Sequence, residues 1–232
     1  MPYASGQGAL MTSFPFPLVA FDLDGTLADT APDLTGALNH ALGELGREPV
    51  PEESVRHMVG HGARALLTKG LAATGEMTPE LVERGFPMFL DFYQAHIADR
   101  SRPFPGIEAA MDDLAGRGVR LAICTNKLEG LARELVAALG WQGRFAAIVG
   151  GDTLPVRKPD PAPLFEAIAR AGGGRAAFVG DSITDTDTAR NAQIPCIAVS
   201  FGFSDRPAEQ LGADMLIDHF DELVPALERL GG

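Results

Sequence analysis

Six short apolar runs alternate with longer segments of helical periodicity along this chain of 232 residues. The runs are residues 18–21, 119–124, 146–149, 176–179, 197–199 and 215–217. Runs of this kind predict strands that are buried on both faces, and such strands occur in parallel sheets whose connections are helices. We therefore predict an α/β fold built on a doubly wound parallel sheet, with helices on both of its faces.

The gap between the first and second runs spans nearly a hundred residues, which is too long for a single crossover between neighbouring strands. Within the gap, apolar residues recur at helical spacing over 34–45, 66–71 and 81–97. The prolines and glycine of 103–106 then end one element and start another. We predict an N-terminal tail over 1–16, a core of 17–29 and 101–232, and an inserted α-helical cap over 30–100 with hinges near 28–31 and 101–103.

Charge excludes some classes of partner. The net charge is −12 and no cluster of Lys and Arg stands out, which argues against a nucleic-acid-binding surface. If the substrate is itself an anion, a metal ion or a few local cations must offset its repulsion from this acidic protein. Any proposed active site has to meet that condition.

The cysteines and the first residues bear on the cellular compartment. Cys124 and Cys196 each border an apolar run, as buried thiols often do, and two such cysteines fit a reducing cytosol. Residues 1–13 lack a basic segment followed by a continuous apolar one, so we expect neither a signal peptide nor a membrane span there. Two interpretations of these residues stay open: translation starts at Met11, or the segment is a disordered tail.

Two carboxylates directly follow the first apolar run, in the segment Phe21-Asp22-Leu23-Asp24-Gly25-Thr26. In an extended chain, side chains two residues apart point the same way, so Asp22 and Asp24 can face one small volume. Paired carboxylates bind a metal ion or perform acid/base chemistry. On the segment alone, both uses stay open.

Other polar residues follow the later runs. Thr125-Asn126-Lys127 comes after the second run, Lys158 lies in the loop beyond the third, and Asp181 follows the fourth. Ligands of open parallel sheets bind at the carboxyl ends of the strands, where these residues converge. That convergence makes each motif more credible than it is alone.

Taken in order, these motifs resemble the haloacid dehalogenase superfamily of phosphatases. The resemblance rests on Asp-x-Asp-Gly-Thr after a strand, a Thr-Asn element, Lys-Pro, and Gly180-Asp181-Ser182 with Asp185, and it spans nearly the whole predicted core. It implies a Rossmann-like core, Mg²⁺ as cofactor, and a small phosphorylated metabolite as substrate. A phosphate monoester is an anion, so the implied metal ion and a lysine would meet the condition set by the acidic net charge.

The resemblance implies a catalytic role for three residues. Asp22 would be the nucleophile and would form an aspartyl-phosphate. Asp24 would protonate the leaving oxygen and later activate water. Lys158 would neutralise both the phosphate and the nucleophile.

It also implies binding roles. Mg²⁺ would be held by Asp22, the backbone carbonyl of Asp24, and Asp181, an all-oxygen set that suits a hard cation. The Thr125 hydroxyl and the Asn126 amide would bind phosphate oxygens. Gly25 would also belong to the phosphate-binding residues, because it lets the backbone turn close to the phosphate. Asp185 and Thr26 would support the site.

Four segments, 103–106, 125–127, 150–155 and 158–164, resemble more specifically the phosphoglycolate phosphatases of this superfamily. The implied substrate is 2-phosphoglycolate, and sugar phosphates or pyrophosphate remain alternatives because the cap selects the leaving group. Dehalogenation is the weaker reading, since the dehalogenases lack an aspartate equivalent to Asp24.

A glycolate leaving group carries a carboxylate, which requires a cation facing Asp22. Arg64, beside Gly60 and Gly62 in the predicted cap, is the favoured candidate, ahead of Arg56 and Lys69. A solvated surface arginine is an equally good reading of Arg64 taken alone.

Several competing readings are weaker. The Asp22-x-Asp24-Gly25 segment lacks the further oxygen ligands of a calcium loop. His57 and His61 are four residues apart, but glycines interrupt the helix that a shared metal would need. Gly60-x-Gly62-x-x-Ala65 matches a loose dinucleotide fingerprint without a preceding strand, and Cys124 has no evident histidine partner.

Two other functions share the same fold. A catalytically silent binding protein is disfavoured by the complete set of Asp22, Asp24, Lys158 and Asp181, although a fold by itself does not fix function. A phosphomutase would differ by returning the phosphoryl group to the substrate. The oligomeric state, monomer or homodimer, stays open.

Overall fold

The computed structural model describes residues 14–204 and 206–232. The predicted tail over 1–16, apart from its last three residues, and the alternative start at Met11 lie outside the described residues. No helix among the described residues has both the length and the apolar character needed to cross a membrane.

A six-stranded parallel sheet forms the core, with the order β5-β4-β1-β6-β7-β8. The first strand along the chain therefore lies in the middle of the sheet, and the strand order reverses beside it, which places a topological switch point at its carboxyl end. The strands are β1 (Leu18–Phe21), β4 (Arg120–Cys124), β5 (Ala147–Val149), β6 (Ala176–Gly180), β7 (Cys196–Val199) and β8 (Met215–Ile217).

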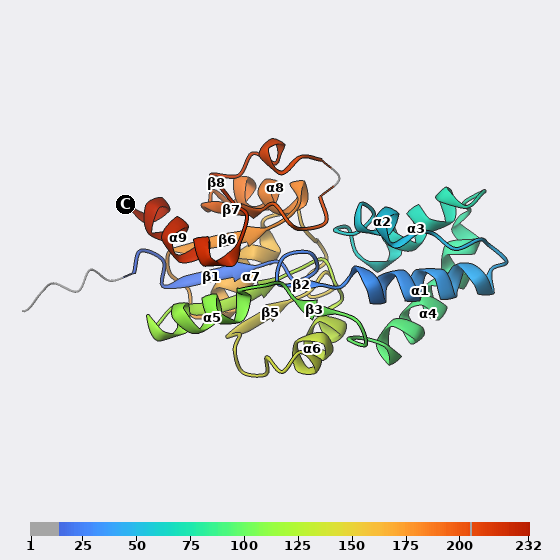
Figure 1. Cartoon of the computed structure of the whole chain (residues 1–232), viewed down its shortest axis with the longest axis horizontal. Helices are drawn as coiled ribbons and strands as arrows, with labels where there is room; N and C mark the ends of the chain where they lie inside the picture. The colour runs from blue at the N-terminus through green and yellow to red at the C-terminus, as the bar shows by residue number, and fades with distance from the viewer. Residues whose placement is uncertain (1–13, 205) are drawn as a thin grey trace, which may run out of the picture.

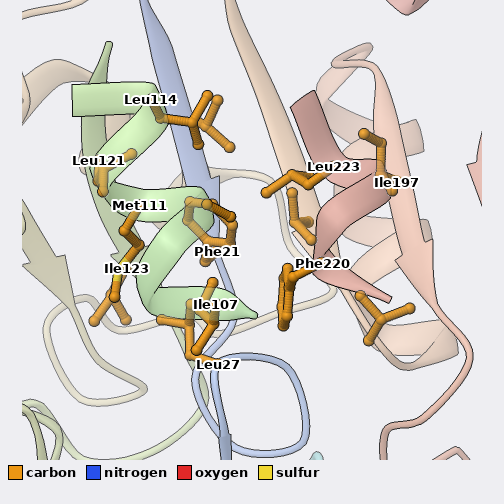
Figure 2. Packing of buried hydrophobic residues seen from close by; sticks show 14 of the residues in the cluster. Phe21, Leu27, Ile107, Met111, Leu114, Leu121, Ile123, Ile197, Phe220 and Leu223 are labelled. Carbon is orange, nitrogen blue, oxygen red and sulfur yellow. The ribbon is translucent and has the colours of Figure 1, made fainter. Parts of the chain in front are cut away.

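Helices cover both faces of this sheet because alternate side chains of each strand point to opposite faces. Val19 and Phe21 pack into the cluster beneath α5, α6 and α9, part of which is shown in Figure 2. Leu18 and Ala20 pack into a second cluster against α7 and α8. The helices are α5 (Ile107–Gly116), α6 (Glu129–Ala138), α7 (Ala162–Arg170), α8 (Ile183–Ala192) and α9 (Leu223–Gly231), with 3₁₀ turns η1 (Ala208–Gln210) and η2 (Phe220–Glu222).

A separate helical unit lies at one end of the core, opposite the C-terminus (Figure 1). It consists of α1 (Ala31–Glu44), α2 (Glu52–Arg56), α3 (Ala63–Ala73) and α4 (Pro79–Ala95). These helices enclose an apolar cluster of their own, to which α6 of the core contributes Leu131. Gly70 lets α3 approach α1 closely, because a Cβ at this position would lie 2.6 Å from Leu38 Cδ1.

Two short strands connect the units. β2 (Ala28–Asp29), where the chain leaves the core, pairs antiparallel with β3 (Arg102–Pro103), where the chain returns. The carboxylate of Asp33 at the start of α1 accepts hydrogen bonds from the backbone of Arg100 and Ser101, at 2.7–3.1 Å. The outgoing and returning segments are thereby tied together at the cap's base.

The predicted fold class is confirmed. All six apolar runs are strands of one parallel sheet, and the gap between the first two runs holds a helical insert. The short helix α2 and the β2–β3 pair were not predicted, because five and two residues are too few to show a periodicity. The boundaries at residues 30 and 100, and cap closure about the hinges, stay predictions.

Candidate active site

The turn after β1 holds Asp22 and Asp24 at the sheet edge. The Asp22 backbone N–H donates to the Val179 carbonyl of β6 at 2.9 Å, so the sheet pairing extends one residue beyond the strand. The chain then turns at Gly25, whose φ of +85° favours glycine. A Cβ at this position would also overlap the Asp181 carboxylate, so glycine is needed for both conformation and space.

Lys158 joins two carboxylates in the interior. Its Nζ lies 2.6 Å from Oδ1 of Asp185 and 3.0 Å from Oδ1 of Asp22, and all three side chains are buried. The Asp22 oxygen is out of line for a hydrogen bond with this ammonium, and no other donor among the described residues reaches it. Oδ1 of Asp22 therefore has an ion-pair partner in Lys158 but no hydrogen-bond donor among the described residues.

Asp185 and Asp181 are fixed by the start of α8. The second Asp185 oxygen accepts from the backbone of Asp181 and Ser182 and from the Ser182 hydroxyl, at 2.6–3.2 Å, which caps the helix. Asp181 accepts from the Thr26 hydroxyl at 2.8 Å and from the Phe203 backbone at 2.6 Å. Asp185 thus both caps α8 and pairs with Lys158.

The cluster is short of positive charge. Asp22, Asp181 and Asp185 each offer an oxygen within 4.8 Å of the others. Burial raises the pKa of Asp22 to about 6, with Asp185 and Asp24 adding to the rise and Lys158 opposing it. Burial and the charges of Asp185 and Asp22 likewise raise the pKa of Asp181 well above its usual range. This all-oxygen donor set with excess negative charge fits a hard divalent cation.

Asp24 has different neighbours. Its carboxylate accepts from Lys127 Nζ at 2.9 and 3.0 Å and from the Thr30 hydroxyl at 2.8 Å. Lys127 also donates to the Tyr93 hydroxyl of cap helix α4 at 2.7 Å. The two aspartates of the motif are therefore paired with two different lysines.

The segment after β4 lies against both Asp22 and the cap. The Thr125 backbone N–H donates to the Val149 carbonyl, and its side chain lowers the pKa of Asp22 by hydrogen bonding. The Asn126 amide nitrogen donates to the carbonyls of Gly60, in the cap, and Lys158, in the core, at 3.0 and 3.1 Å. Its Oδ1 is buried without a partner among the described residues. A polar atom left unpaired in this way is available to a ligand.

A cavity of about 30 Å³ lies between the cap and this edge of the core. Its polar lining comes from Asp22, Asp24, Thr125, Asn126 and Lys127. Cap residues supply most of the apolar remainder, including Leu34, Leu66 and Phe89. The arrangement leaves a small, partly enclosed space next to both aspartates.

Most of the residues singled out in the sequence come together here. Arg64 does not line the cavity. Its guanidinium pairs with Glu83 at 2.5 Å and lies over the ring of Phe86, another cap residue. Arg56 pairs with Asp29 at 2.7 Å, and Lys69 donates to the Met58 carbonyl. None of the three cations considered for the cap lines the cavity.

Sequence reasoning missed Lys127, Tyr93 and Thr30. Lys127 stood in the Thr-Asn-Lys element, and its charge at a strand end was a usable signal. Tyr93 and Thr30 gave no such signal, because a tyrosine in an apolar helix and a threonine before a helix are common in proteins without any functional role. The glycine loop at Gly60 and Gly62 is a loop as predicted, and it also forms part of the cavity wall.

The competing sites gain no support. Within residues 14–204 and 206–232, the only group of His, Cys, Asp and Glu side chains close enough to share a metal is the aspartate cluster. His57 Nδ1 lies instead 3.0 Å from the Ser204 carbonyl. Cys124 is fully buried, and burial raises its pKa to about 12, which disfavours a nucleophilic thiolate.

Comparison with known proteins agrees with this geometry. The family described as haloacid dehalogenase-like hydrolase matches residues 19–199. The chain is 48% identical over 215 residues to the phosphoglycolate phosphatase of Caulobacter vibrioides, covering 90% of this chain and 89% of that one. It is 45% identical over 221 residues to the phosphoglycolate phosphatase of Agrobacterium fabrum, covering 94% and 95%.

A solved structure shows the same fold. A protein of Haemophilus somnus, described as a predicted phosphoglycolate phosphatase, superposes with a TM-score of 0.86 at 28% identity. The alignment covers 91% of this chain and 98% of that one. With its motifs gathered at one sheet edge and most of its length matched, the chain belongs to the haloacid dehalogenase-like hydrolase family.

Proposed function

We propose that this protein is a Mg²⁺-dependent phosphatase that hydrolyses a small phosphate monoester, 2-phosphoglycolate, through an aspartyl-phosphate. One observation carries the proposal: Asp22 and Asp24 line the same cavity, and Lys158 lies against Asp22, whose Oδ1 has no hydrogen-bond donor among the described residues. A carboxylate can approach an anionic phosphate only where positive charge offsets the repulsion.

The reaction divides into two steps at Asp22. First, an Asp22 oxygen bonds to phosphorus while the bond from phosphorus to the ester oxygen breaks, and Asp24 gives that oxygen its proton. Second, Asp24 takes a proton from a water molecule, whose oxygen bonds to phosphorus and releases the Asp22 carboxylate and inorganic phosphate. The Thr125 hydroxyl and the backbone N–H of Asn126 donate to the phosphate oxygens, and Lys158 compensates their charge.

The metal would be held by Asp22, Asp181 and the backbone carbonyl of Asp24. The shortage of positive charge around Asp22 and Asp181 supports this assignment. When bound, Mg²⁺ would neutralise charge on the phosphate and on the carboxylates around it. Asp185 positions Lys158, and Thr26 positions Asp181.

The substrate assignment draws on the relatives and on the cap. The curated relatives named above are phosphoglycolate phosphatases. With a cavity of about 30 Å³, far below the size of typical ligand pockets, we expect the cap to move when any of these substrates enters. The division into a core of 17–29 and 101–232 and a cap of 30–100 belongs to the same proposal, because the cap is what would select the leaving group.

A substrate panel tests this proposal. With Mg²⁺ present, we expect kcat/KM for 2-phosphoglycolate to exceed that for hexose phosphates, nucleotides and pyrophosphate by about 10-fold or more, because the cap would select the leaving group. Released phosphate measures the rate. A flat profile would contradict the assignment of 2-phosphoglycolate, and recovery of an isomeric sugar phosphate would indicate a mutase.

Metal binding can be tested without activity. We expect the melting temperature of EDTA-treated protein to rise on addition of MgCl₂, because an ion that binds only the folded state stabilises it, by about 2.7 kcal/mol at a hundredfold excess over Kd. Asp181→Asn should lose most of this rise. Asp187→Asn is the matched control, since Asp187 lies on α8, the helix that follows Asp181, and pairs with Arg190. Equal rises in both variants would rule out Asp181 as a ligand.

A further inference from the structure

The cavity is lined by a cation that the catalytic proposal does not use. Lys127 is buried, with 6% of its surface exposed, and its ammonium lies among Asp24 and Tyr93 rather than in solvent. Within residues 14–204 and 206–232, it is the one lysine or arginine that lines the cavity. Its Nζ lies 2.9 and 3.0 Å from the two carboxylate oxygens of Asp24 and 2.7 Å from the Tyr93 hydroxyl.

We propose that Lys127 is the specificity-determining residue that binds the carboxylate of the leaving group, with the Tyr93 hydroxyl as a second donor to the same carboxylate. This inference rests on the proposed function and deepens it. It names the group by which the site would tell a carboxylate-bearing monoester from an uncharged one.

Placement supports this role. In 2-phosphoglycolate, an ester oxygen and one methylene separate phosphorus from the carboxylate carbon, so the carboxylate must lie in the same small cavity as the phosphate. Lys127 follows the proposed phosphate-binding residues Thr125 and Asn126 directly, and its Nζ is 2.9 Å from Asp24. The cavity therefore places a cation beside the residue proposed to protonate the leaving oxygen.

Tyr93 adds a donor from the cap. Its oxygen accepts from Lys127, so its own proton is not used in that bond. Burial raises the pKa of Tyr93 to about 12, which keeps the hydroxyl protonated. A carboxylate beside Lys127 can therefore take one hydrogen bond from the core and one from the cap, and binding it requires α4 to be in place.

The charge count requires such a cation. Lys158 is already shared by Asp22 and Asp185, and the proposed metal would be taken up by the carboxylates and the phosphate. Lys127 pairs with one carboxylate, that of Asp24, the residue proposed to bring a proton to the leaving oxygen. A substrate carboxylate adds one more negative charge to a partly enclosed, mostly apolar space. Burying that charge without a partner would be strongly unfavourable. Arg64, paired with Glu83, is not placed to supply it.

The test compares 2-phosphoglycolate with its amide, phosphoglycolamide, which has nearly the same shape and no carboxylate charge. For wild type, we expect a preference for the carboxylate in kcat/KM. Lys127→Gln should lower that preference by about 30-fold, mainly through KM, because a charge-assisted bond is lost for one substrate only. Lys127→Arg should retain the preference, and Lys69→Gln, whose lysine binds the Met58 carbonyl, should leave it unchanged.

The outcomes separate the two proposals. If wild type shows no preference for the carboxylate, the assignment of 2-phosphoglycolate fails. If wild type prefers it and Lys127→Gln prefers it equally, with both substrates slowed alike, Lys127 only positions Asp24 and this inference is overturned.

A structure makes the test independent of how well the Gln variant folds. In crystals of the inactive Asp22→Asn variant with 2-phosphoglycolate bound, we expect the Lys127 Nζ within hydrogen-bonding distance of the substrate carboxylate. A carboxylate bound to Arg64, or turned toward solvent, would overturn the inference.

Discussion

Asp22→Asn is expected to lower the rate of phosphate release by on the order of 10⁴-fold or more, the scale seen when an enzyme loses its nucleophile. An amide has nearly the same shape as the carboxylate, but it cannot form the aspartyl-phosphate, which is an acyl phosphate. Single-turnover phosphate release with 2-phosphoglycolate at saturating Mg²⁺ measures the effect. A loss of less than about 10-fold would mean that Asp22 is not the nucleophile.

The melting temperature of Asp22→Asn shows whether its loss of activity comes from the chemistry or from unfolding. Burial raises the pKa of Asp22 from an ordinary 3.8 to about 6 in the folded protein. The ionisation of Asp22 therefore lowers the free energy of unfolding as pH rises from 3.8 to 6, and this loss persists at higher pH. Without metal, Asp22→Asn should therefore melt no lower than wild type at pH 7.5, and the difference should shrink toward pH 4. A clearly lower melting temperature at pH 7.5 would show that the Lys158 pair outweighs burial. Asp187→Asn, away from the cluster, controls for the change of aspartate to asparagine.

The strands were predictable because most of the runs are buried on both faces. A strand such as Leu18–Phe21 must be apolar at every position to fill the clusters on the two sides, which leaves an unbroken signal in the sequence. The cap followed from chain length and helical spacing. Elements such as α2 and the β2–β3 pair depend on contacts that no local pattern records.

Part of the site was predictable from the positions of the strands. Asp22, Lys158 and Asp181 follow strands, and the sheet brings strand ends together whatever lies between them in sequence. The position of the cap relative to that edge depends on tertiary packing. Sequence pattern therefore pointed to Arg64, beside a glycine loop that does reach the cavity, although its side chain pairs with Glu83. Lys127 and Tyr93 meet only after the cap has packed on the core.

Lys158→Met is expected to destabilise the metal-free protein by about 3–5 kcal/mol, because removing one partner of a buried ion pair leaves the others uncompensated. Lys158 is 2% exposed, and its ammonium is shared by Asp22 and Asp185. Burial alone would lower its pKa, but these carboxylates raise it above the usual range. Urea unfolding of the EDTA-treated variant measures the loss, and Lys69→Met is the control for a lysine outside the cluster.

The double variant Lys158→Met/Asp185→Asn should recover part of this stability. It removes one of the two carboxylates that Lys158 leaves behind, while the asparagine oxygen can still cap α8. Activity should not return, because neutralising a carboxylate in the interior does not restore the positive charge that faces the phosphate. If Lys158→Met unfolds at the same urea concentration as wild type, the cluster is held neutral by protons, and Lys158 serves catalysis alone.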